Sequence, residues 1–149
     1  MRTTLVAAGL VFYLSACAAD SYQRLQAPRL DVEVGSPDVA RIYVLRMPQM
    51  RGAVRGVRIV ENDREVGRIG KDSYLCWERK PGSSLLQVVY EGPILDGESQ
   101  SIVDLTCDAG QVYYLGITID AAWNRPVVRM LAATEARPIL GEAKIAPSN

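Results

Sequence analysis

From residue 40 onward the sequence is a succession of short apolar segments separated by turn residues. Segment 99–107 is the clearest, because Val103, Leu105 and Cys107 share one face of an extended strand. Turn signals such as Asn62-Asp63 and Pro81-Gly82 separate these segments. We expect strands at 40–47, 54–60, 65–69, 73–78, 85–90, 99–107, 111–119 and 126–134. No segment shows a sustained helical stripe with caps. The pattern predicts an all-β fold, a small antiparallel β-sandwich of about seven to eight strands, with a half-open barrel as the alternative.

The N-terminus is typical of a bacterial lipoprotein signal peptide. A basic start at Met1-Arg2 precedes the uncharged run 5–14, which is too short to cross a bilayer as a helix. Small residues then lead to Cys17 in the run Leu14-Ser15-Ala16-Cys17. We expect a diacylglyceryl group on the Cys17 thiol, cleavage before it, and a mature chain anchored through membrane lipid. An ordinary signal peptide with an incidental cysteine is the alternative. Residue 18 is alanine rather than aspartate, which favours the periplasmic face of the outer membrane for a lipoprotein.

The remaining domain boundaries follow from composition. Turn-forming residues break any long period up to residue 38, so we expect a flexible tether there. The predicted organisation is a signal peptide at 1–16, lipidated Cys17 with its tether at 17–38, the β-sandwich at 39–134 and a C-terminal tail at 135–149.

Two cysteines are left in the domain once Cys17 is lipidated. In an oxidising periplasm, Cys76 and Cys107 would most simply form a disulfide that closes a loop of about 32 residues. Two buried reduced thiols or a reactive pair are the alternatives. No Cys-x-x-Cys spacing is present, and no histidine could lower a thiol pKa, which disfavours redox catalysis.

The sequence contains no histidine, which excludes Ser-His-Asp and Cys-His catalysis and any histidine-ligated zinc. Acidic residues gather in two places, Glu61 with Asp63 and Glu65, and Asp96 with Glu98, but neither group has a calcium-loop pattern. We interpret both as solvated turns and expect no metal, no cofactor and no enzymatic activity. Balanced charge, with 17 basic and 17 acidic residues, also argues against a nucleic-acid partner.

Arginines crowd the first third of the domain and give it a net charge of about +4. They are Arg41, Arg46, Arg51, Arg55, Arg58, Arg64 and Arg68. Arg51, Arg55 and Arg58 are candidate residues for binding an anionic lipid or an acidic envelope protein. The alternative is a series of solvent-facing strand positions. Trp123 lies in a polar loop and is a further candidate contact for a partner, unless it folds back on the core.

Several of these motifs, in this order, resemble a family of bacterial envelope proteins known as domain of unknown function 2846. The resemblance covers about residues 40–120 and is most specific at Ala109-Gly110 followed by Tyr113-Tyr114. It also includes the strand 41–46, Asn62-Asp63 followed by Val66-Gly67, Tyr74, and Pro81-Gly82. One departure is Asp63, where the family favours glycine in the turn. The resemblance implies a small β-sandwich on a secreted lipoprotein and supplies no catalytic residues.

Three classes of function fit these observations to different degrees. The first is a lipid-anchored, non-catalytic protein that binds another envelope component or serves as an accessory subunit. The second is a periplasmic inhibitor of an enzyme such as a lysozyme or protease, with loops 49–53 and 121–125 inserting into the target. The third, a hydrolase or transferase, would need a carboxylate pair in a cleft and is disfavoured.

Overall fold

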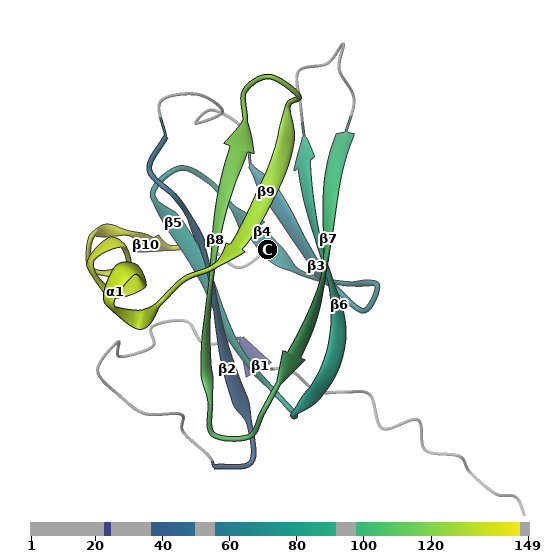
Figure 1. The fold of residues 1–149 in the computed structure, drawn as a ribbon, viewed down its shortest axis with the longest axis vertical. Helices are drawn as coiled ribbons and strands as arrows, with labels where there is room; N and C mark the ends of the chain where they lie inside the picture. The colour runs from purple at the N-terminus through teal and green to yellow at the C-terminus, as the bar shows by residue number, and fades with distance from the viewer. Residues whose placement is uncertain (1–22, 25–36, 50–55, 92–97, 147–149) are drawn as a thin grey trace, which may run out of the picture.

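Ten strands and one short helix make up the described part of the protein (Figure 1). A computed structural model describes residues 23–24, 37–49, 56–91 and 98–146. The elements are β1 (Gln23–Arg24), β2 (Ala40–Arg46), β3 (Val57–Glu61), β4 (Arg64–Ile69), β5 (Ser73–Arg79), β6 (Gly82–Glu91), β7 (Glu98–Cys107), β8 (Val112–Asp120), β9 (Arg125–Met130), α1 (Ala133–Glu142) and β10 (Lys144–Ile145). Each strand expected from the alternating pattern is present, with ends shifted by a few residues.

The strands form two sheets that pack face to face, which confirms the all-β sandwich. Sheet A has the order β1-β5-β2-β8-β9, with β10 paired to β5, and sheet B has the order β4-β3-β6-β7. Most neighbours are antiparallel, but β2 and β8 run parallel in the centre of sheet A, and so do β10 and β5. Parallel neighbours need a long crossover connection, and here the chain between β2 and β8 includes all four strands of sheet B.

The main core fills the space between the sheets. It is built from the alternate positions that the sequence places on one face, as in β8, where Leu115, Ile117 and Ile119 all point inward. Trp77 is fully buried in this core and is among its largest side chains. Burial of large apolar side chains is the main term that stabilises such a sandwich.

Helix α1 differs from the predicted C-terminal tail. It covers the outer face of sheet A, where Ala136 and Leu140 pack with Tyr43 and Leu45 in a second apolar cluster. The backbone N–H of Ala146 then bonds the carbonyl of Tyr74, so the domain continues well past residue 134. The helix has no side-chain N-cap and contains Pro138, which explains why the sequence pattern did not indicate it.

The β3–β4 hairpin turn is also explained by its residues. Asn62 and Asp63 both adopt positive φ angles, 46° and 63°, as the two central positions of a type I′ turn require. Asn and Asp are the non-glycine residues that tolerate this conformation best. Asp63 therefore forms the turn in place of the glycine that the resemblance leads one to expect.

Part of the predicted tether is a strand. Gln23 and Arg24 of β1 pair with Glu78 and Trp77 at the edge of sheet A. The signal-like residues and Cys17 lie outside the described residues, and so do Arg51, Arg55 and Asp96. The one helix described, α1, is neither long nor apolar enough to cross a membrane.

Candidate functional site

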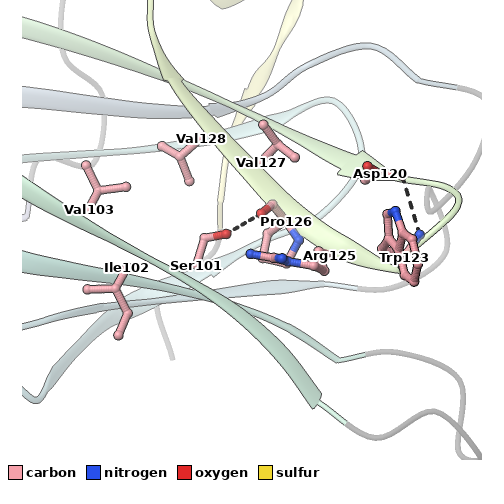
Figure 2. Close-up of a pocket in the computed structure, with 9 residues that line it drawn as sticks. All are labelled: Ser101, Ile102, Val103, Asp120, Trp123, Arg125, Pro126, Val127 and Val128. Atoms are coloured by element: carbon pink, nitrogen blue, oxygen red, sulfur yellow. Dashed lines mark hydrogen bonds between the residues drawn. The ribbon is translucent and has the colours of Figure 1, made fainter.

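A cleft lies between the edge strands of the two sheets, β9 of sheet A and β7 of sheet B (Figure 2). Its volume is about 340 Å³. Trp123 stands on the turn at one end, and Val103 and Val128 lie close together toward the other end. The two edges are joined at the Trp123 end, where the Ser99 hydroxyl donates to the carbonyl of Asn124 and the Ser101 hydroxyl to that of Pro126.

Among the described residues, most of the exposed large apolar side chains lie on or beside this cleft. Trp123 is 75% exposed, Ile102 55%, Met130 53% and Val127 46%. The fifth such side chain in the described part of the chain, Leu85, is 48% exposed and lies on β6 in sheet B, outside the set of residues that line the cleft. Clustered rather than scattered exposure of this kind is typical of a binding surface.

The turn that carries Trp123 is held by its own side chains. Asp120 Oδ1 accepts hydrogen bonds from the backbone N–H groups of Ala122 (2.8 Å) and Trp123 (3.4 Å). Asn124 adopts a positive φ of 53°, which reverses the chain into β9. The carboxylate of Asp120 therefore has a structural role, and the turn presents the indole to solvent.

The outer edge of β9 can be derived from its pairing with β8. The N–H of Leu131 donates to the carbonyl of Tyr114 (2.8 Å), so residue 131 and every second residue before it face β8. The residues between them, Pro126, Val128 and Met130, direct their backbone groups away from β8. The carbonyl of Pro126 accepts from Ser101, but among the described residues no strand pairs with Val128 or Met130 on that side.

The arginines predicted to form a patch are separated by the fold. Arg41 is buried and pairs with Glu78 at 2.7 Å. Arg46 is also buried, 5.9 Å from the centre of the Tyr90 ring, and desolvation lowers its pKa. Arg58 and Arg68 lie at the surface and pair with Glu98 (3.2 Å) and Glu91 (3.1 Å).

Strand alternation accounts for this separation, because positions 41 and 46 fall on opposite faces of β2. Of the candidate binding residues, Arg58 and Trp123 are described, and they do not share a site: Arg58 pairs with Glu98 on sheet B, and Trp123 lines the cleft.

The expected disulfide is wrong: Cys76 and Cys107 are both free and buried. Cys76 points outward from sheet A into the cluster under α1, whereas Cys107 points into the core between the sheets. Trp77, next to Cys76, takes the inward position on β5, so alternation turns Cys76 away from its intended partner. Burial raises the pKa of Cys76 to about 12 and that of Cys107 to about 11, which leaves both thiols protonated.

Glu61 is buried rather than part of a solvated turn. Its carboxylate accepts a hydrogen bond from Trp77 Nε1 (2.9 Å) and pairs with Arg79 Nη1 (2.9 Å), and Arg79 also bonds Ser84. This network links the two sheets, because Trp77 and Arg79 belong to β5 and Glu61 to β3. Asp63 and Glu65 are exposed, as expected for a hairpin turn. Among the described residues, no cluster of three or more histidines, cysteines or carboxylates could hold a metal ion.

Comparison with known proteins gives no relative for this chain. No protein-family model matches it, and neither curated proteins nor solved structures include a significant match. The resemblance to domain of unknown function 2846 therefore stays a prediction.

Proposed function

We propose that the protein is a non-catalytic binding module, anchored through lipid on Cys17 at the periplasmic face of the outer membrane. Its partner is another envelope protein, which it binds at the β7–β9 cleft. The observation that carries this proposal is Trp123, which is 75% exposed on a turn that Asp120 and Asn124 hold in place. Tryptophan contributes more binding energy than most residues when a partner buries it, and exposure in the free protein leaves that energy available.

The proposal is tested by cross-linking in native membranes followed by affinity purification. We expect a stoichiometric partner with the wild type that is lost with Trp123→Ala. Leu85→Ala is the matched control, because it also removes an exposed apolar side chain but lies outside the cleft. A partner that remains with Trp123→Ala would contradict the cleft as the binding surface.

The lipid anchor is tested separately in the same membranes. Cys17→Ala should release the protein from the membrane fraction and abolish incorporation of labelled palmitate. Retention of Cys17→Ala in the membrane would contradict lipid attachment at this residue without bearing on the cleft.

The alternative function is inhibition of a periplasmic enzyme such as a lysozyme or protease. It draws on the same observation, because the Trp123 turn lies within the predicted inserting loop 121–125. The other predicted loop, 49–53, lies outside the described residues except for Gln49. The side chain of Gln49 bonds the backbone of Ile119 in both directions, at 2.7 and 3.4 Å. Recovery of an enzyme whose activity falls on binding would select this function over an accessory role.

A further inference from the structure

We propose that the free edge of β9 binds an extended peptide segment of the partner as an added strand, with an apolar side chain on Trp123 and a carboxylate on Arg125. This inference rests on the proposed function and deepens it, since it names the kind of segment that the cleft takes.

The first argument is the backbone of β9. Val128 and Met130 direct an N–H and a C=O away from β8, and no described residue occupies these groups. An unpaired row of donors and acceptors on a sheet edge is the template for strand addition. Ser99 and Ser101 occupy the edge only at Asn124 and Pro126, so the open part begins at Val128.

The second argument is that the opposite edges of the sandwich are protected. The β5 edge of sheet A carries β1 and β10. The β4 edge of sheet B carries exposed charged side chains, Arg64, Glu65 and Arg68, which discourage pairing with another strand. Beside β9 the protein exposes three large apolar side chains, Trp123, Val127 and Met130. Two exposed arginines, Arg125 and Arg129, lie on the same strand. Pro126 lacks an N–H at the start of this edge, so the part of the edge open to pairing begins at Val128.

The third argument is charge. Arg125 lines the cleft, and its side chain makes no hydrogen bond or ion pair with any residue that the structure describes. The other arginine of β9, Arg129, is paired with Glu135 of α1. The acidic side chain that lines the cleft, Asp120, accepts two backbone N–H groups of its own turn through Oδ1. The guanidinium of Arg125 is complementary to a carboxylate, which it can bind through two parallel hydrogen bonds.

The size of the cleft fits one or two side chains of such a segment. Its volume of about 340 Å³ lies at the lower end of ligand pockets, which span roughly 300–1,000 Å³. Val103 and Val128 provide apolar walls, and Trp123 closes the end next to Arg125. Side chains on one face of the added strand would contact these walls, since they alternate along an extended chain.

The experiment selects displayed random twelve-residue peptides on the purified mature domain. We expect the selected peptides to carry apolar residues at every second position, as in an extended strand, and to be enriched in Asp and Glu. Val128→Pro should weaken their binding about tenfold, because it removes one outward N–H. Pro126 already occupies the equivalent outward position two residues earlier, which shows that proline at such a position is compatible with the hydrogen bonds between β8 and β9. Arg125→Glu should weaken binding similarly, and Arg137→Glu, an exposed arginine on α1, is the matched control.

A second measurement does not depend on any variant folding correctly. Amide hydrogen exchange at Val128 and Met130 of the wild-type protein should slow by about tenfold or more when a selected peptide is bound. Selected peptides that leave these two amides unchanged would overturn strand addition. A selection without any enriched peptide would also overturn strand addition. The same holds if no peptide is selected and the protein instead binds phosphatidylethanolamine and phosphatidylglycerol vesicles through Trp123.

The membrane pull-down separates this inference from the proposed function. A partner lost with Trp123→Ala but retained by a folded Val128→Pro protein would overturn strand addition and leave the binding module intact. A partner retained by both variants would overturn both proposals.

Discussion

The two tryptophans lie in regions of opposite character. Trp77 is fully buried where β5 meets sheet B, and its indole N–H is bonded to Glu61, which in turn pairs with Arg79. Trp123 is 75% exposed, and the only interaction described for it is a hydrogen bond from its backbone N–H to Asp120. In the first region the indole N–H, the carboxylate and the guanidinium bind one another inside the protein. In the second, the polar groups hold a turn in place and leave the aromatic ring free.

The comparison shows how one residue type can serve stability or recognition according to its neighbours. Around Trp77 lie the buried carboxylate of Glu61 and the partly buried guanidinium of Arg79, charges that are costly to desolvate unless they are paired. Around Trp123 it leaves apolar area in water on an unpaired edge, which costs stability and solubility. Five predictions break or sharpen this contrast, from the largest expected effect to the smallest.

The thiols of the buried region should be almost inert. With pKa values of about 12 and 11, Cys76 and Cys107 are largely protonated at pH 8. We therefore expect labelling by a thiol reagent to be slower in the folded than in the urea-unfolded protein, by about a thousandfold at Cys76 and about a hundredfold at Cys107. Labelling is measured by mass spectrometry on the domain with Cys17→Ala. Equal rates in both states, or a disulfide in the folded protein, would contradict the buried free thiols.

The same thiols make stability depend on pH in a defined direction. Above the ordinary thiol pKa of 9.0 the unfolded chain loses these protons, whereas the folded chain keeps them until about 11–12. The unfolded state then binds fewer protons, so the free energy of unfolding should fall as pH rises from 9 to 11. Cys76→Ala with Cys107→Ala should flatten this part of the profile.

Removal of the buried indole should be the most destabilising single change in the comparison. Trp77→Ala should lower the free energy of unfolding by about 3–5 kcal/mol, because it leaves a cavity and removes a donor from the buried Glu61. Urea denaturation measures the change. Trp77→Phe keeps most of the volume but not the N–H, and a cost near zero for this variant would show that the hydrogen bond to Glu61 contributes little.

The serine links between the sheets should contribute an intermediate amount. Ser99→Ala and Ser101→Ala each remove one hydroxyl that bonds a carbonyl of the β9 region, and each should cost about 1 kcal/mol. The double variant should also speed amide exchange at the start of β9. Ser83→Ala is a control, because its hydroxyl bonds Thr106 at the surface within sheet B and does not join the sheets.

The exposed indole should have the smallest effect on stability. Trp123→Ala should change the free energy of unfolding by no more than about 0.5 kcal/mol, since the side chain is mostly in water already. Solubility should rise and partner binding should fall. A loss of 2 kcal/mol or more would mean that the indole packs on the domain, which would remove the contrast with Trp77.

The sequence predicted the strands well because alternation is a local signal. β7 and β8 each carry their inward positions at every second residue, and both strands appear within a residue or two of the predicted bounds. α1 was not predicted, because its buried face consists only of Ala136 and Leu140 and is interrupted by Pro138. Its helical state depends on the apolar outer face of sheet A, which is assembled from strands distant in sequence.

The site was less predictable for the same reason. Trp123 was identified from its polar neighbours, but the cleft beside it depends on β7 meeting β9, which no local pattern indicates. The sequence predicts a solvated turn for Glu61, because it does not show that Trp77 and Arg79 approach this carboxylate from another sheet. The predicted disulfide is wrong because alternation does not show which face of a strand is turned to the core: Cys76 faces outward from sheet A, whereas Cys107 of sheet B faces the core.

The parallel pairing of β2 with β8 has a consequence for the order of folding. Arg41 of β2 pairs with Val112, so the centre of sheet A cannot close until the chain has been made as far as β8. Two hairpins of sheet B, β3–β4 and β6–β7, join strands that follow each other in the chain and can form earlier, whereas contacts between distant segments form slowly. During synthesis one long side of β2 therefore has no partner, a period of exposure to aggregation that ends only when β8 arrives.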